Sequence, residues 1–267
     1  MIQRRSKRLL ALGVAAALVF AALPWLIRGV WAYRSSNPVR RGVVLATDLG
    51  CFSCHGPLGG KGVPDPGGEG LEVPAWSGGL WMMYVSSDEE IREFILDGVS
   101  RKRAASQSAK KDRERMAVRM PAFESVLGRG EIDDLVAAFR VLSGMSHPPE
   151  GSAEERGQAL ARTWRCFACH NAGAAGGLPN PKSFAGFIPG WYGADFRDLV
   201  RGRGEFDDWI RKGRIDRLDR NLVASFFIRR QRIRMPAYEK LTPQELDDLW
   251  AYGTWLGETG GVVRERP

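Results

Sequence analysis

The sequence has few of the residue types that most often bind transition metals. It contains four cysteines and three histidines in 267 residues. So few cysteines exclude a disulfide-rich scaffold. All of these residues except His147 lie in two short segments, so any cysteine- or histidine-based cofactor site is confined to those segments. His147 lies beside two prolines, and we interpret it as a solvated linker residue.

Acidic residues are absent from the first 40 positions, which carry seven basic residues. Positions 41–267 hold the other 32 basic residues and all 31 acidic ones, so this part is nearly neutral. The net charge of +8 therefore describes an N-terminal tail. A nucleic-acid-binding protein would need a basic folded domain, and none is indicated.

Charge is also missing from residues 9–27, a run of 19 mostly apolar residues after the basic stretch QRRSKR. At about 1.5 Å per helical residue the run nearly crosses a bilayer core of about 30 Å. A retained membrane anchor and a cleaved signal peptide both remain open. The run exceeds the roughly 7–15 residues of a signal-peptide core, which favours the anchor. We therefore assign residues 1–36 to a basic tail and a transmembrane helix.

No segment alternates convincingly between apolar and polar residues, so strands are not predicted. Helical spacing occurs instead, for example in SSDEEIREFILDG, where Ser87 is a candidate N-cap and Gly98 a candidate end. Further start signals are Asn37-Pro38, Ser152 with Glu155, and Thr242-Pro243 with Glu245. The sequence predicts an all-α fold.

The chain behind the tail is one module used twice. A shift of 115 residues aligns CFSCH at 51–55 with CFACH at 166–170, and RMPAFE at 119–124 with RMPAYE at 234–239. The turn-rich stretch at 143–152 joins the copies. We place the first module at 37–147 and the second at 148–267.

Each copy carries the pattern Cys-x-x-Cys-His, which is typical of covalent c-type haem attachment. The spacing lets both thiols reach one edge of a porphyrin, and the next residue brings an imidazole under the iron. Zinc would need four ligands around one ion, whereas each cysteine pair here has its own histidine. A thioredoxin-like site would need a βαβ setting. The cofactor-binding residues predicted by this pattern are Cys51, Cys54, His55, Cys166, Cys169 and His170.

The choice of the second iron ligand is narrowed by the few candidate ligand residues in the second module. From position 151 onward His170 is the only histidine and Met235 the only methionine. Met120 is the counterpart of Met235 in the first module. We therefore predict Met120 and Met235 as ligands, with a five-coordinate haem or a lysine ligand left open. The other methionines are interpreted as packing residues.

With these motifs, the chain resembles a membrane-anchored tandem of class I cytochrome c domains. The resemblance covers 37–145 and 152–258 and rests on the Cys-x-x-Cys-His, the Gly- and Pro-rich loop after it, the MPAF or MPAY element and the closing helix. It implies two small helical cytochrome c domains and two haem c groups, each with histidine and methionine ligation. It also implies haem attachment on the outer, periplasmic side of the cytoplasmic membrane.

The function implied is electron transfer without catalysis, as a subunit or tethered partner of a membrane respiratory or photosynthetic oxidoreductase complex. The redox partners would be proteins, with the membrane contacted through the N-terminal helix. A dihaem enzyme such as a peroxidase is the alternative. It would need one open iron site, which the methionine element in both modules disfavours.

The resemblance also suggests two further pairs of residues around each haem. In this family a proline carbonyl after the attachment loop often accepts a hydrogen bond from the histidine ligand, and Pro64 and Pro179 match by position. Trp76 and Trp191 could donate an indole N–H to a haem propionate, or could simply be buried.

Two basic segments lie between the middle helix and the methionine element. Residues 101–119 hold eight basic and two acidic residues, and residues 211–234 hold nine and two. A solvated surface, a docking surface for an acidic partner and a counter-charge for the haem propionates are the three interpretations left open.

Overall fold

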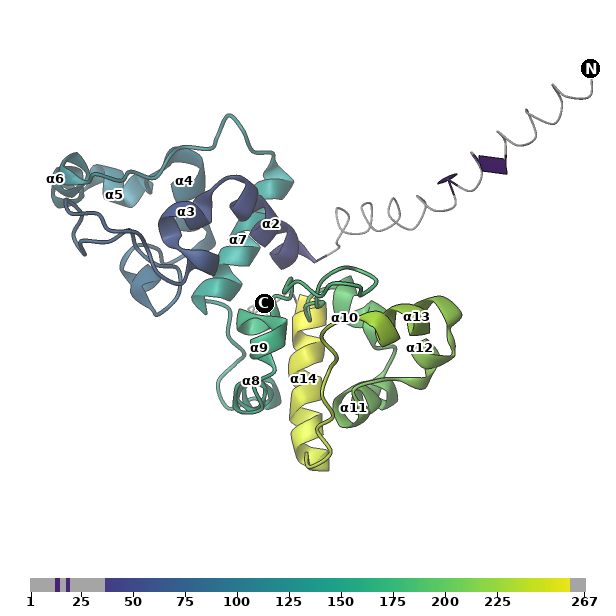
Figure 1. The fold of residues 1–267 in the computed structure, drawn as a ribbon. Coiled ribbons are helices and arrows are strands. Elements are labelled where there is room, and N and C mark those ends of the chain that lie inside the picture. The colour runs from purple at the N-terminus through teal and green to yellow at the C-terminus, as the bar shows by residue number, and fades with distance from the viewer. Residues whose placement is uncertain (1–12, 15–17, 20–36, 260–267) are drawn as a thin grey trace, which may run out of the picture.

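The computed structural model describes residues 13–14, 18–19 and 37–259. These residues form two helical lobes that correspond to the two sequence modules (Figure 1). Within the described ranges there is no strand, and the only β-type pairings are two isolated bridges. The all-α prediction is confirmed for this part of the chain.

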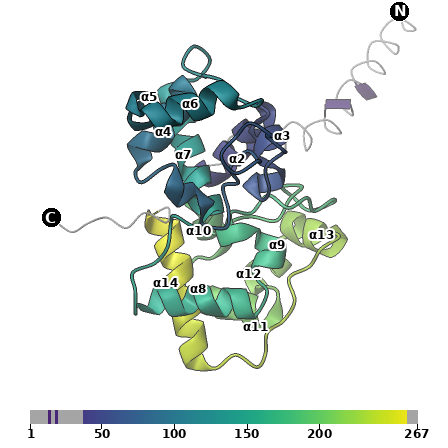
Figure 2. The same cartoon turned by 90° about the vertical axis from the view of Figure 1, so that its left-hand side faces the viewer.

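The first module contains seven short helical elements before its closing helix. They are α2 (Pro38–Asp48), α3 (Cys51–His55), η1 (Pro57–Gly59), η2 (Leu80–Met83), α4 (Asp88–Asp97), α5 (Arg101–Ala105) and α6 (Gln107–Arg115). The closing helix α7 (Arg129–Ser143) packs across α2 and α4 (Figures 1 and 2). The module's core lies between these helices and includes Trp76, Ile91 and Leu135.

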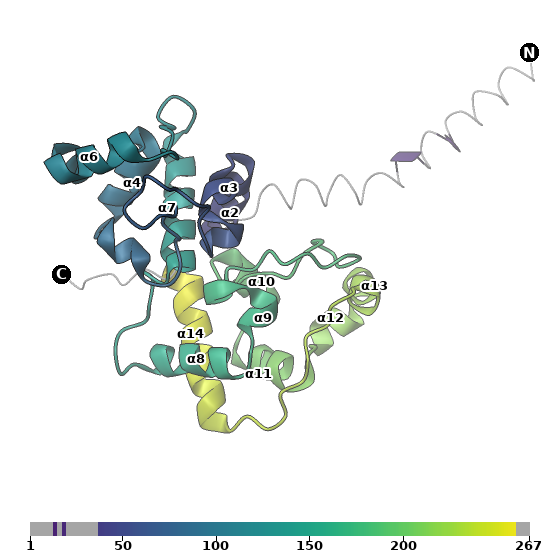
Figure 3. The same cartoon turned by 60° about the vertical axis from the view of Figure 1, so that its left-hand side comes forward.

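The second module repeats this order in the lower lobe of Figure 1. Its elements are α8 (Ala153–Thr163), α9 (Phe167–His170), η3 (Ala172–Ala174), α10 (Ala194–Leu199), α11 (Arg203–Lys212), α12 (Asp216–Arg220), α13 (Leu222–Arg230) and α14 (Pro243–Thr259). The long helix α14 crosses α8, as α7 crosses α2 in the first module (Figure 3).

The crossing of first and last helix depends on one glycine in each module. A Cβ placed on Gly42 would lie 1.9 Å from the carbonyl oxygen of Asp134, and one on Gly157 would lie 2.0 Å from that of Asp248. No other residue permits so close a backbone approach. The sequence repeat therefore preserves a contact between helices that lie about 90 residues apart in the chain.

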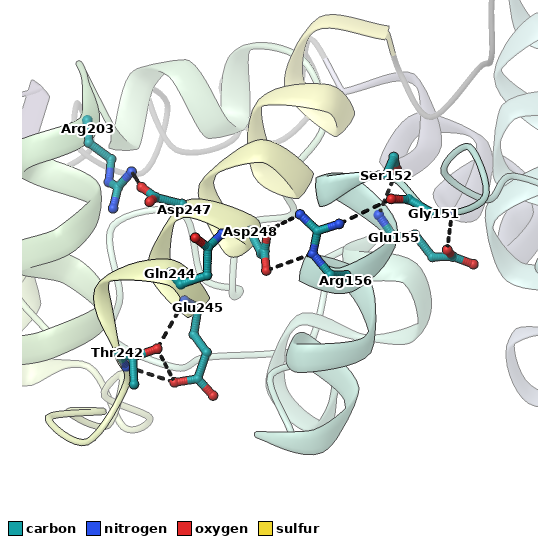
Figure 4. Close-up of polar contacts among 10 residues, drawn as sticks. All are labelled: Gly151, Ser152, Glu155, Arg156, Arg203, Thr242, Gln244, Glu245, Asp247 and Asp248. Carbon is teal, nitrogen blue, oxygen red and sulfur yellow. Dashed lines mark hydrogen bonds and ion pairs between the residues drawn. The ribbon is translucent and has the colours of Figure 1, made fainter.

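An arginine next to each glycine fastens the same crossing. Arg41 makes a bidentate ion pair with Asp134, with nitrogen–oxygen distances of 2.7 and 2.6 Å. Arg156 pairs with Asp248 in the same way at 3.1 and 2.9 Å (Figure 4). The carboxylates are largely buried, so these charge-assisted pairs are shielded from water on one side and hold the helices at a fixed angle.

The predicted helix starts are confirmed. Ser87 caps α4 by accepting a hydrogen bond from the Glu90 N–H, and Gly98 ends that helix in the left-handed conformation. Thr242 and Glu245 form a reciprocal capping box at the start of α14 (Figure 4). The side chains of Asn37 and Ser152 cap α2 and α8.

The two modules contact each other along the start of α2 and the end of α7. Val39 and Val141 are buried in the core of the second module, although both belong to the first. Asn37 is fully buried and its amide donates to Asp195 at 3.2 Å. The guanidinium carbon of Arg40 lies 3.3 Å from the centre of the Phe187 ring. The beginning of the first module is therefore fixed to the second.

The basic segments fold as short helix pairs, α5 with α6 and α12 with α13. Both pairs lie on the outer side of their module (Figure 1). Arg217 of α12 makes a bidentate ion pair with Glu205 of α11, with nitrogen–oxygen distances of 2.7 and 2.9 Å. Its guanidinium also donates to the carbonyl of Leu199.

The predicted transmembrane helix lies almost entirely outside the described residues. Of the run at 9–27, the structure describes only 13–14 and 18–19. No helix within the described part of the chain is long and apolar enough to cross a bilayer.

Replacing the crossing glycine should destabilise the first module. Gly42→Ala forces a methyl group onto the Asp134 carbonyl, and we expect a loss of about 1–3 kcal/mol in the free energy of unfolding, as for an overpacked core. Gly130→Ala is the matched control, because a Cβ at that position would have no atom within 4 Å. In α7 it should be neutral or stabilising by about 0.5–1 kcal/mol. Urea unfolding of both variants measures the difference, and equal stabilities would contradict the crossing.

The Glu205–Arg217 pair should make stability depend on pH. The hydrogen bond from Arg217 lowers the pKa of Glu205 to about 2, and the partial burial of the carboxyl opposes this only in part. A lowered folded-state pKa contributes stability above the unfolded value of about 4.3, and this stability is lost as the pH falls toward 2. The stability difference between the parent protein and Glu205→Gln should therefore shrink from pH 6 to pH 3. Glu239→Gln, which changes an exposed glutamate, is the control variant, and urea unfolding at each pH provides the measurement.

Candidate functional site

Each Cys-x-x-Cys-His segment forms a short helix directly after the first helix of its module. In the first module Gly50, with φ of 77°, turns the chain from α2 into α3. Its counterpart Arg165 adopts the same left-handed conformation without being glycine. The four cysteines are free, and those of one pair lie on a single helical turn. Burial raises the pKa of Cys51 and raises that of Cys166 to about 11, so both are neutral thiols near pH 7.

The histidine after each cysteine pair is oriented by a backbone carbonyl. His55 Nδ1 donates to the carbonyl oxygen of Pro74 at 2.7 Å, and His170 Nδ1 donates to that of Pro189 at 2.9 Å. Since a carbonyl only accepts, the proton sits on Nδ1 and leaves the lone pair on Nε2 for a metal. Burial lowers the pKa of both histidines, partly offset by this hydrogen bond, which favours the neutral ligand form.

The prediction that Pro64 and Pro179 supply this carbonyl is wrong. The loop after each attachment helix doubles back, so that Pro64 bridges to Glu72 and Pro179 to Phe187. The chain then returns to the histidine ten residues later, at Pro74 and Pro189. The repeat of the spacing Pro-x-Trp at 74–76 and 189–191 was the signal in the sequence for these residues.

In the first module, a cavity lies beside His55. Its volume is about 230 Å³, far more than the roughly 10–15 Å³ that one water requires. Cys51, Cys54, His55 and Met120 all line it, and most of the remaining lining is apolar, including Val73, Ile91, Phe94, Leu135 and Phe139. The attachment residues and the predicted second ligand, 65 positions away from the histidine, therefore meet around one space.

The segment that carries each methionine packs against a glycine that ends an earlier helix of the module, α4 in the first and α11 in the second. A Cβ on Gly98 would lie 2.4 Å from the carbonyl oxygen of Met120, and one on Gly213 would lie 2.3 Å from that of Met235. Both glycines have positive φ, at 72° and 66°. The left-handed turn and the close approach together require glycine there, and they set the position of the methionine backbone.

A second tether comes from the loop after the attachment helix, and sequence reasoning missed it. Fully buried Asp65 accepts hydrogen bonds from Ala117 N and Val118 N, at 2.8 and 3.4 Å. Asn180 does the same for Ile233 N at 2.8 Å and also donates to the Ile233 carbonyl at 2.9 Å. The signal in the sequence was the repeat of Pro-Asp-Pro at 64–66 as Pro-Asn-Pro at 179–181.

Trp76 and Trp191 lie beside the histidines. They are 9% and 7% exposed, and their ring centres are 5.5 and 5.2 Å from those of His55 and His170. Trp76 also lines the cavity. Both tryptophans therefore help to enclose the histidine, and their hydrogen bond to a propionate remains a prediction.

The other predicted residues take the following places. His147 is exposed in the joint, with Nδ1 3.0 Å from the Pro148 carbonyl. Met116 lines the first cavity but has Gln231 as its repeat counterpart, so it is not part of the repeated site. Among the described residues, no three His, Cys, Asp or Glu side chains group as a metal site.

The donor set fits a haem. Two thiols, an imidazole with a free Nε2 and a thioether line the same large apolar cavity. The thiols are the groups that would attach the porphyrin edge, and the imidazole and thioether are the ligands that would suit the haem iron. The second module has the same backbone tethers at the corresponding positions. Comparisons of the chain with protein-family models, curated proteins and solved structures found no match.

Breaking the second-module tether should loosen the methionine segment. Asn180→Ala removes both hydrogen bonds to Ile233, and at about 0.5–1.5 kcal/mol each we expect a stability loss of about 1–3 kcal/mol. Asn180→Asp copies the residue of the first module and keeps the acceptor, so its loss should be smaller. Amide hydrogen exchange at Ile233 tests this locally. Unchanged protection in Asn180→Ala would show that the tether does not hold the segment.

Proposed function

We propose that this chain is a membrane-anchored dihaem cytochrome c that carries electrons and does not catalyse a reaction of its own. One haem c would be held in each module, by His55 and Met120 in the first and by His170 and Met235 in the second. Bound haem iron accepts and releases one electron at a time. The haem modules would lie on the periplasmic side, next to a respiratory or photosynthetic oxidoreductase complex that exchanges electrons with them.

The observation that carries this proposal is the convergence of ligands on one cavity. Both thiols, the imidazole and Met120 line the same space, although they come from opposite ends of the module. The Pro74 carbonyl fixes the imidazole, and Gly98 and Asp65 position the methionine segment. A ligand pair held by the backbone on both sides leaves no position open for a substrate and changes little when the charge of the iron changes.

The contact between modules supports electron transfer within the chain. The turn η3, which begins two residues after His170, packs on α7 of the first module. Gly173 in this turn approaches Val141 so closely that a Cβ would lie 2.8 Å from its side chain. The attachment region of the second module is therefore held against the closing helix of the first.

A dihaem peroxidase is the competing function. It requires one iron with an open position and an acid–base group near it. The methionine segment is tethered in the same way in both modules, which disfavours this alternative. Purified full-length chain from a host that matures c-type cytochromes provides the test. We expect two covalently bound haems, two one-electron steps in a redox titration and no peroxide turnover. One haem per chain, or rapid peroxide turnover, would contradict the proposal.

Removing one methionine should open one iron. Reduced parent protein should bind carbon monoxide poorly, whereas Met120→Ala and Met235→Ala should each give one haem that binds it readily and has a lower reduction potential. Met116→Ala is the matched control, because Met116 lines the same cavity as Met120. Difference spectra with carbon monoxide provide the measurement. Binding in Met116→Ala, or none in Met120→Ala, would overturn the ligand assignment.

A further inference from the structure

Helix α13 exposes large apolar side chains to solvent. Leu222 is 86% exposed, Val223 60% and Phe226 49%. The Arg230 guanidinium carbon lies 5.0 Å from the centre of the Phe226 ring. Between Leu222 and Tyr238 the chain has four arginines and no acidic residue. Helix α13 lies on the outer side of the second module (Figures 1 and 3). It therefore presents exposed apolar side chains together with exposed arginines to solvent.

The repeat shows that the fold does not need these apolar residues. The shift of 115 places α13 on α6, and QSAKKDRER in the first module becomes LVASFFIRR in the second. Both helices have nine residues, begin with a side-chain cap and follow a five-residue helix. Gln107, Ser108 and Lys111 occupy the positions of Leu222, Val223 and Phe226. The same helix is therefore built with polar residues in one module, and the apolar face of α13 has another use.

A chain of contacts connects α13 to the start of the folded part of the protein. Phe227 packs on Phe184, with ring centres 5.3 Å apart. Phe184 belongs to the loop that ends at Phe187, and Arg40 of α2 covers the Phe187 ring. Asn37, the first residue of the continuous described stretch 37–259, is fixed to the same module. Helix α13 and the start of α2 thus both contact the stretch 184–187 of the second module.

The length of the intervening chain keeps this part of the molecule near the bilayer. Nine residues, 28–36, separate the predicted membrane span from Asn37. Even when fully extended they reach only about 30 Å. Exposed Leu, Val and Phe next to arginine are the composition of a helix that lies in a membrane interface, with the apolar side chains among lipid tails and the arginines at anionic headgroups.

We propose that the apolar face of α13 is a membrane-contact surface, which inserts Leu222, Val223 and Phe226 into an anionic lipid leaflet and fixes the second module against the bilayer. The inference rests on the proposed membrane anchor. It assigns a lipid partner to the second basic segment, residues 211–234, which contains α13. The first basic segment, residues 101–119, has polar residues at the equivalent positions of α6. The two modules would then differ in orientation: the second faces the membrane and the first is left open to a soluble or peripheral redox partner.

The test uses the full chain in lipid nanodiscs that contain phosphatidylglycerol, with a photo-crosslinker at one position. Leu222→p-benzoylphenylalanine should form lipid adducts several-fold more often than Gln107→p-benzoylphenylalanine, its repeat counterpart. Equal labelling at the two positions, in a chain that co-elutes with the discs, would overturn the inference alone. A chain that does not co-elute with the discs would overturn the membrane anchor as well. In native membranes, adducts to a protein in place of lipid would identify a protein docking surface and also overturn it.

Reversing the charge of two arginines on α13 tests whether they bind anionic lipid headgroups or only lie near the bilayer. Arg229→Glu with Arg230→Glu should lower lipid labelling at position 222 several-fold in anionic discs and little in zwitterionic discs. Lys110→Glu with Lys111→Glu is the control, because these exposed lysines lie on the matching helix α6. Unchanged labelling in the α13 variant, with its haem spectrum intact, would show that the arginines do not recognise the leaflet.

Discussion

The close crossing of the first and last helix is the constraint on which each module depends. Gly42 and Gly157 let the backbones approach to a distance that no other side chain allows, and the Arg41–Asp134 and Arg156–Asp248 pairs lock that approach. The attachment helix follows directly from one member of the crossing pair. Its cysteines and histidine are therefore placed by the crossing, and the residues of the following loop line the cavity of the first module.

The loops after the attachment helices are held in part by hydrogen bonds between side chains and backbone groups. The doubled-back loop brings Pro74 under His55, and Asp65 of the same loop holds the segment before Met120. One loop thereby orients His55 and tethers the segment before Met120. The arrangement recurs in the second module with Pro189 and Asn180. Each of these hydrogen bonds joins a side chain to a backbone group.

The modules differ most where the fold constrains them least. Helices α6 and α13 occupy equivalent positions, yet one is polar and the other exposes Leu222 and Phe226. By contrast, the glycine and the arginine–aspartate pair at the helix crossing are the same in both modules. Divergence at an exposed site is the expected result when two copies of a domain have the same internal task and different surroundings, and it motivates the distinct membrane role proposed for the second module.

The sequence by itself determined the helical class in the described residues, the repeat, the helix caps and the cysteine–histidine motif, because each of these depends on residues close together in the chain. It could not determine which proline carbonyl meets the histidine, since the choice between Pro64 and Pro74 depends on how the loop folds back. Nor could it show that Asp65 reaches the methionine segment. The contact between the modules through Arg40 and Phe187 was equally hidden. The tertiary structure decided these contacts, because they join residues that meet only where the chain folds back on itself, as Asp65 meets Ala117 and Arg40 meets Phe187.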